Sequence, residues 1–113
     1  KLDRLVAIVD CNRLQLDSST AEIMPLEPLN QKFEAFGWNV IRVDGHDVAR
    51  LSDAFAQAKA HVGQPTVILA DTVKGKGVTV FENQIRFHGG RPTADEYRIA
   101  FEEINAKIAH QEA

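Results

Sequence analysis

Three short apolar runs rich in valine and isoleucine predict buried parallel strands at residues 5–10, 39–43 and 66–71. Their nearly continuous apolar character is typical of strands that are covered on both faces. Elsewhere apolar residues recur every three or four positions, which predicts amphipathic helices. We expect Phe36 and Trp38 to lie in the core. The three helical stripes are Leu26, Leu29, Phe33 and Phe36; Val48, Leu51, Phe55, Ala58 and Val62; and Tyr97, Phe101, Ile104 and Ile108.

Capping residues mark the ends of these helices. Gly37 follows the first stripe, where a left-handed C-cap favours glycine. Asp47 precedes the second stripe as an N-cap, and Thr93 with Glu96 forms a capping-box pattern before the third. The order is therefore strand, loop, helix, strand, helix, strand, long loop, helix. This order predicts an α/β fold, part of a doubly wound domain with a parallel sheet.

The predicted sheet is small for such a domain. Most sheets contain more than three strands, and parallel sheets are normally covered on both faces. The first strand begins at Leu5, with nothing before it to pair with. We therefore expect residues 1–113 to be the C-terminal part of a larger domain whose upstream part is missing.

Composition narrows the class of protein. The chain has 113 residues, 44% hydrophobic and 26% charged, which suits one globular domain. A net charge of −3 without a cluster of basic residues argues against nucleic-acid binding. The longest apolar runs, "LVAIV" and "TVILA", are too short to span a membrane. Cys11 is the single cysteine, which excludes an internal disulfide and suits a cytoplasmic protein.

Polar residues follow each predicted strand, at positions 10–12, 44–47 and 71–74. Open parallel sheets bind ligands outside the carboxyl ends of their strands. The third group continues into "KGKG", residues 74–77, whose glycines allow a close approach to an anion. This loop lacks the spacing of a Walker motif. A phosphate-binding loop and a flexible turn both fit the pattern.

Asn12 is a more specific candidate for a metal ligand because it follows the first strand directly. Its amide oxygen is a hard ligand suited to Mg²⁺ or Ca²⁺, and the backbone carbonyl of Leu14 offers a second oxygen. A third protein ligand and a diphosphate would complete an octahedron. The alternative is a loop asparagine that hydrogen-bonds its own backbone. Spacing alone favours this alternative.

Four motifs together resemble a known family. The segments "LVAIVDCNRLQLD", "KFEAFGWNVIRVDGHD", "PTVILADTVKGKGV" and "FHGG" occur in this order. They resemble the diphosphate-binding domain of transketolases, and in particular the N-terminal subunit of two-chain transketolases. The resemblance extends from Leu5 to about Phe101. It implies part of an enzyme that depends on thiamine diphosphate and Mg²⁺ and transfers a two-carbon ketol unit from a ketose to an aldose or aldose phosphate.

The resemblance implies roles for five residues. Asn12 would bind the metal through its side chain and Leu14 through its carbonyl, while Leu16 would line the thiazolium pocket. Lys74 would lie near the diphosphate and the substrate. His88 would contact the cofactor and the donor sugar and assist proton transfer. Lys74 and His88 are therefore the catalytic candidates, and all five residues are candidates for cofactor binding.

The family also uses parts that these residues do not contain. An upstream Gly-Asp-Gly motif supplies the third protein ligand to the metal, and a pyrimidine-binding domain supplies the glutamate that activates the cofactor. The resemblance therefore implies a chain that is inert alone and works with a C-terminal transketolase subunit, in a dimer or heterotetramer. His46 is expected to order its loop, and Lys76 to be solvated.

Other activities remain open at this point. A 1-deoxyxylulose-5-phosphate synthase, from the same superfamily, also uses a "KGKG" loop. An α-keto acid dehydrogenase fits less well, because "DCNRLQLD" lacks its usual paired asparagines. A non-catalytic binding module of the flavodoxin type would leave "NRL" and "FHGG" unexplained.

Overall fold

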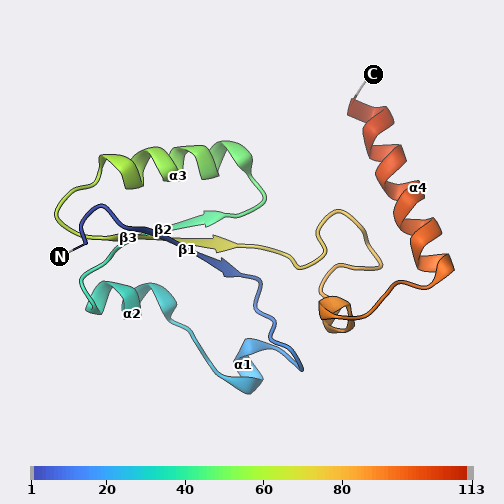
Figure 1. Cartoon of the computed structure of the whole chain (residues 1–113), viewed down its shortest axis with the longest axis horizontal. Coiled ribbons are helices and arrows are strands. Elements are labelled where there is room, and N and C mark those ends of the chain that lie inside the picture. The colour runs from blue at the N-terminus through green and yellow to red at the C-terminus, as the bar shows by residue number, and fades with distance from the viewer. Residues whose placement is uncertain (1, 112–113) are drawn as a thin grey trace. The chain divides into compact units, whose positions relative to one another are not determined.

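The computed structural model describes residues 2–111. The chain forms two compact units. The first runs to Arg13 and resumes from Met24 to Thr72, and the second comprises Leu14–Ile23 and the chain from Val73 onward. The first unit contains the sheet, and the second contains the long loop and the last helix (Figure 1).

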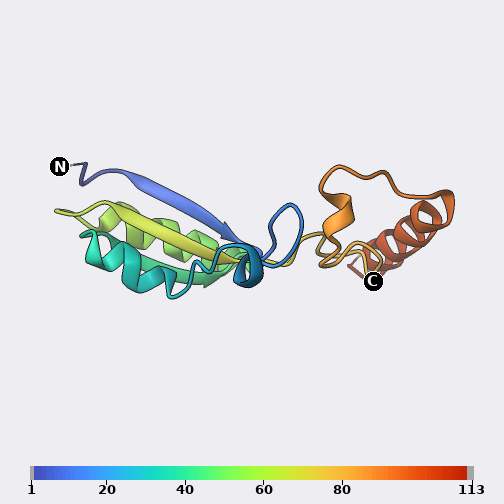
Figure 2. The same ribbon diagram turned by 90° about the horizontal axis from the view of Figure 1, so that it is seen from below.

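A parallel sheet forms the centre of the first unit. Within residues 2–111 it consists of β1 (Val6–Cys11), β2 (Asn39–Asp44) and β3 (Thr66–Asp71). The strands follow the order β1-β3-β2, so β3 lies between the other two (Figure 2). The three predicted strands are therefore confirmed, each within one residue at either end. The expected α/β class with parallel pairing is confirmed as well.

Two helices cover opposite faces of this sheet, α2 (Leu29–Ala35) and α3 (Val48–Ala60) (Figure 1). Ala54 and Ala58 of α3 are buried against Val43 and Ile68 of the sheet, with Leu51 packed beside them. Small side chains let the helix approach the strands closely. Because β3 is central and covered on both faces, its residues 67–69 have no solvent exposure.

The predicted caps of the first unit are confirmed. Gly37 is left-handed, with φ of +78°. Its N–H donates to the Glu34 carbonyl at 2.9 Å, and the Trp38 N–H donates to the Phe33 carbonyl at 3.1 Å. This pair of bonds is a Schellman motif, which satisfies the last carbonyls of α2. At the start of α3, the Asp47 carboxylate accepts from the Arg50 N–H at 3.0 Å.

Several predicted core positions are wrong. Phe36 is 85% exposed, because it is the C-cap residue of α2 and lies beyond the part of the helix that faces the sheet. Trp38 is half-buried and packs edge-to-face on Phe33, with ring centres 5.6 Å apart. Three residues of the second predicted stripe are exposed, Val48, Phe55 and Val62. Val62 lies beyond the end of α3 at Ala60, and the helix contacts the sheet through Ala54 and Ala58 rather than through Phe55.

The second unit contains α1 (Thr20–Ile23), a short 3₁₀ helix η1 (Ile85–His88) and α4 (Ala94–Gln111). The predicted capping box before α4 is confirmed. The Thr93 N–H donates to the Glu96 carboxylate at 2.8 Å, and the Glu96 N–H donates to Thr93 Oγ1 at 3.3 Å. The periodicity of α4 is helical as predicted. Its apolar stripe is exposed, however, with Tyr97, Phe101, Ile104 and Ile108 between 45% and 64% accessible.

None of the helices within residues 2–111 combines the length and the apolar character that crossing a membrane would require.

Candidate functional site

The carboxyl ends of the three strands lie side by side, as the parallel topology requires. Cys11, Asp44 and Asp71 occupy the same register position on β1, β2 and β3. The loop after β2 contacts the end of β3, where the Gly45 N–H donates to the Asp71 carbonyl at 2.7 Å. A Cβ atom on Gly45 would lie 2.5 Å from Thr72 Cγ2 and 3.1 Å from the Asp71 carbonyl oxygen, so a larger residue here would have to displace the Thr72 side chain.

The chain bends sharply immediately after β1. Asn12 is half-buried and directly follows the strand. Arg13 then adopts a left-handed conformation with φ of +62°. For a residue other than glycine this conformation costs about 1–2 kcal/mol, so contacts elsewhere must stabilise it. The bend falls between the two residues that the sequence predicts as metal ligands, Asn12 and Leu14.

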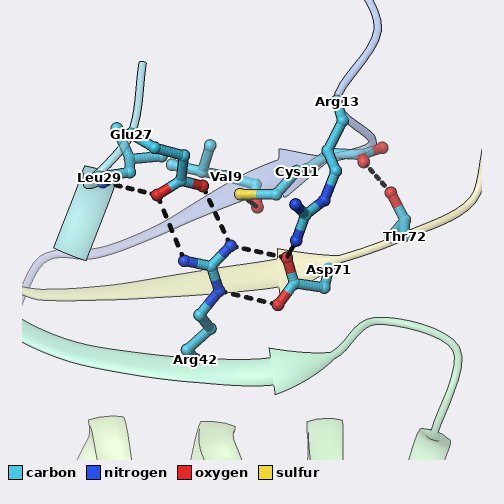
Figure 3. Close-up of polar contacts among 9 residues, drawn as sticks. Val9, Cys11, Arg13, Glu27, Leu29, Arg42, Asp71 and Thr72 are labelled. Atoms are coloured by element: carbon cyan, nitrogen blue, oxygen red, sulfur yellow. Dashed lines mark hydrogen bonds and ion pairs between the residues drawn. The ribbon is translucent and has the colours of Figure 1, made fainter. Parts of the chain in front are cut away.

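A network of charged side chains lies on the face of the sheet that carries α2 (Figure 3). Arg42 Nε and Nη2 of β2 donate to the two carboxylate oxygens of Asp71 at 2.8 and 2.9 Å. The same guanidinium donates to Glu27, with Nη2 3.1 Å from Oε1. Asp71 also accepts from Arg13 Nη2 at 3.4 Å. The Asp71 carboxylate therefore links β3, the middle strand, to Arg13, the residue after Asn12.

The network keeps its own groups charged. The Arg42 guanidinium lowers the pKa of Asp71, and it also lowers that of Glu27, whose carboxylate accepts from the Leu29 N–H. The two carboxylates in turn raise the pKa of Arg42. Burial and the nearby Asp71 raise the pKa of the Cys11 thiol. Because a thiol reacts as its thiolate, Cys11 is a poor nucleophile despite its position beside the strand ends.

In the second unit, the glycine- and lysine-rich loop is closed by a backbone hydrogen bond and contains a left-handed glycine. Gly75 is left-handed with φ of +74°, and a Cβ atom there would lie 2.4 Å from the Phe81 carbonyl oxygen. The Asn83 N–H donates to the Lys74 carbonyl at 2.9 Å, which closes the loop. Lys74 is half-buried at its base. The predicted anion-binding loop therefore has a defined backbone conformation.

Helix α4 holds this loop from one side. The Thr79 N–H donates to the Glu103 carboxylate at 2.8 Å, and Lys107 Nζ donates to the Gly77 carbonyl. The hydrogen bonds from Thr79 lower the pKa of Glu103. Lys76 Nζ lies 3.9 Å from Glu82 in an exposed ion pair. A surface pair of this kind fits the solvated role expected for Lys76.

His88 is the exposed last residue of η1. Neighbouring side chains hold this short helix in place. Phe87 packs edge-to-face on Phe81 with ring centres 4.5 Å apart, and Arg86 forms an ion pair with Glu96 at the start of α4. The structure therefore presents the His88 imidazole to solvent from a well-packed segment.

Leu14 begins a tight reversal of the chain. It forms an isolated antiparallel bridge with Ser19, and the Gln15 N–H donates to the Ser18 carbonyl at 2.8 Å. Leu16 is exposed within this reversal. The pocket-lining role of Leu16 stays a prediction.

The predicted site residues are divided between the two units. Asn12 belongs to the first, whereas the second contains Leu14, Leu16, Lys74 and His88. Sequence reasoning missed the charge network, although an arginine at position 42 inside the strand "NVIRVD" was a signal. The partner, Asp71, is identified only by the pairing of β2 with β3, which the sequence alone does not give.

A parallel sheet with helices on both faces and polar groups at its carboxyl ends defines an α/β ligand-binding domain. The family described as "Transketolase, thiamine diphosphate binding domain" matches residues 1–107. The chain therefore belongs to the thiamine diphosphate-binding domain family of transketolases. Family membership excludes the flavodoxin-like alternative.

Curated relatives agree with this family. A 6-deoxy-6-sulfo-D-fructose transketolase subunit of Clostridium sp. (strain MSTE9) is 41% identical over 109 residues, which cover 96% of this chain and 40% of that protein. An apulose-4-phosphate transketolase subunit of Phocaeicola vulgatus is 38% identical, covering 96% of this chain and 38% of that protein. Human transketolase is 46% identical over 89 residues, 79% of this chain and 14% of the human protein.

Solved structures share the fold. Transketolase from Campylobacter jejuni superposes with a TM-score of 0.69 at 23% identity, covering 99% of this chain and 21% of that one. Transketolase from Leishmania mexicana gives a TM-score of 0.61 at 27% identity, covering 96% and 19%. The chain thus spans two fifths or less of each of these relatives.

Proposed function

We propose that this chain is the diphosphate-binding part of a transketolase that depends on thiamine diphosphate and Mg²⁺. The observation that carries the proposal is the family match over residues 1–107, with Asn12 in the bend at the carboxyl end of β1. In this type of fold, ligands bind at that end of the strands.

The residues present fit a metal bound together with a diphosphate. The Asn12 amide oxygen and the Leu14 carbonyl oxygen are neutral hard donors, which Mg²⁺ accepts. Within residues 2–111, no cluster of three histidine, cysteine or acidic side chains offers an alternative metal site. Neutral donors suit a site in which the two phosphates of the cofactor bring the negative charge. The third protein ligand would come from outside these residues.

Three further side chains complete the proposal. The Lys74 ammonium neutralises phosphate charge from the base of its hydrogen-bonded loop, and Leu16 excludes water from the reacting centre. The exposed His88 imidazole holds substrate oxygens and moves a proton to or from them. When bound, thiamine diphosphate supplies the carbanion chemistry that breaks a carbon–carbon bond beside a ketose carbonyl.

The proposed partner is a second polypeptide that carries the pyrimidine-binding half. Two relatives that match nearly the whole chain are named as transketolase subunits, which supports this division of the enzyme. The substrates proposed are a ketose donor and an aldose acceptor, free or phosphorylated. These two relatives bear different sugars in their names, so the proposal stays at this class.

Substitution of Asn12 tests the metal site directly. In the assembled protein, Asn12→Ala should weaken thiamine diphosphate binding at least ~10-fold at limiting Mg²⁺, because even outer-shell partners of a metal typically contribute that much. Isothermal titration at several Mg²⁺ concentrations measures the effect. Asn105→Ala, at an exposed position on α4, is the control and should bind normally. Equal affinity in both variants would remove Asn12 from the site.

A further inference from the structure

The arginine inside β2 has a more specific arrangement than a surface charge requires. Arg42 presents two parallel N–H donors to both oxygens of Asp71, at 2.8 and 2.9 Å. Such bidentate pairs fix orientation as well as charge. Glu27 holds the other side of the same guanidinium, with Oε1 at 3.1 Å from Nη2. The Asp71 carboxylate is therefore held in one orientation.

That orientation directs the carboxylate toward the bend after β1. Asp71 is the register partner of Cys11, the residue that precedes Asn12. Its Oδ1 accepts both from Arg42 and, at 3.4 Å, from Arg13 Nη2 (Figure 3). Arg13 is the left-handed residue on the other side of Asn12. The backbone of Asn12 is thus held on both sides, by the strand before it and by an ion pair after it.

We propose that Arg42 and Asp71 are positioning residues, which act through Arg13 to hold Asn12 in the backbone conformation that binds the metal. The inference rests on the proposed function, since it assigns a purpose to the network only if Asn12 is a metal ligand. Arg42 and Asp71 lie on the two strands that do not carry Asn12. The bend after β1 is therefore coupled to the rest of the sheet through side chains, in addition to the strand pairing.

A double-mutant cycle distinguishes two roles for Arg13: holding Asn12 in place through Asp71, or contacting the diphosphate of the cofactor directly. The variants are Arg13→Gln, Asp71→Asn and the double variant, each in the assembled protein. The readout is the Mg²⁺ concentration needed for half-maximal thiamine diphosphate binding, measured by titration calorimetry. The unfolding midpoint of each variant is measured alongside. Arg50→Gln is a matched control, because Arg50 has a similar exposed ion pair, at 3.3 Å from Asp47.

The expected result is that each single variant raises the Mg²⁺ requirement about 10-fold, the lower end of the range for residues that orient metal ligands. The double variant should show no further loss, because both substitutions break the same chain of contacts. Arg42→Lys, which keeps the charge but loses the bidentate geometry, should resemble Asp71→Asn. The unfolding midpoint should change little in Arg13→Gln, and Arg50→Gln should bind as the wild type does.

Three outcomes would overturn the inference. Additive losses in the double variant would mean that Arg13 contacts the anion itself, independently of Asp71. An unchanged Mg²⁺ requirement in Arg13→Gln, with Asn12→Ala still defective, would show that the network serves only the sheet. Wild-type protein that binds no thiamine diphosphate, or binds it without regard to Asn12, would refute the proposed function and the inference together.

Discussion

Two isoleucines on the same face of the sheet allow the packing to be tested with one type of substitution. Ile8 of β1 and Ile68 of β3 are register partners, so both side chains point to the face that carries α3. Ile68 is fully buried, with Val43 and Ala54 in its cluster, whereas Ile8 is 57% exposed. The same truncation to alanine at the two positions should therefore have very different consequences.

The expected magnitudes follow from burial. Ile→Ala removes carbon atoms that are each worth about 0.8 kcal/mol when buried. At Ile68 the cavity left behind adds to this transfer loss, so the free energy of unfolding should fall by about 2–5 kcal/mol. At Ile8 less than half of the residue is shielded from water, and no cavity forms. The expected loss there is about 1 kcal/mol.

Denaturant unfolding, followed by a probe on the first unit, measures both losses by linear extrapolation. If the dependence of the unfolding free energy on denaturant concentration is the same in both variants and the wild type, each substitution changes stability rather than the surface exposed on unfolding. Equal losses of unfolding free energy at the two positions would refute this reasoning, because they would show that Ile8 is buried in the assembled protein. A small loss at Ile68 would refute the core described for β3.

Two further predictions concern catalysis and pH. His88→Ala should lower kcat of the assembled protein about 10²–10⁴-fold while most of the cofactor affinity remains, because the imidazole would act on substrate protons. Steady-state kinetics at saturating cofactor measure this effect, with His110→Ala as the control. A near-normal kcat in His88→Ala would mean that His88 takes no part in proton transfer. The Arg42 guanidinium lowers the pKa of Asp71 in the folded state. The ion pair therefore stabilises the folded state above the unfolded pKa of Asp, about 3.9. This stabilisation is lost as the pH falls toward the lower pKa of the folded state. Unfolding curves from pH 6 to about pH 3 should therefore be less acid-sensitive in Asp71→Asn than in the wild type, and parallel curves would show that the pair contributes nothing.

Local signals in the sequence determined the three strands, the three longer helices and their order, but not the short α1 and η1 in the loops. Continuous apolar runs located the three strands within a residue, because buried parallel strands have no polar face. The caps at Gly37, Asp47 and Thr93 were equally readable, since each depends on hydrogen bonds between residues close together in the chain. The order of motifs, together with Asn12 after the first strand, was sufficient to suggest the family.

Burial of the helical stripes depended on the tertiary structure. Periodicity shows that one helical face is apolar, but not whether a sheet lies opposite it. The stripe of α3 is only partly covered because the helix lies over β2 and β3, and Ala54 and Ala58 make the contact rather than Phe55. The stripe of α4 is exposed. Phe36 was expected in the core and is a surface residue at a helix end.

The charge network also required the tertiary structure. Arg42 and Asp71 are far apart in the sequence and carry no motif, and they meet because β3 lies beside β2 in a register that brings their side chains together. Arg13 reaches the same carboxylate only because β1 lies on the other side of β3. The sequence by itself determined which residue follows the first strand, because that is a local pattern. The contacts that hold this residue in place depend on pairings between distant segments, which only the folded chain brings together.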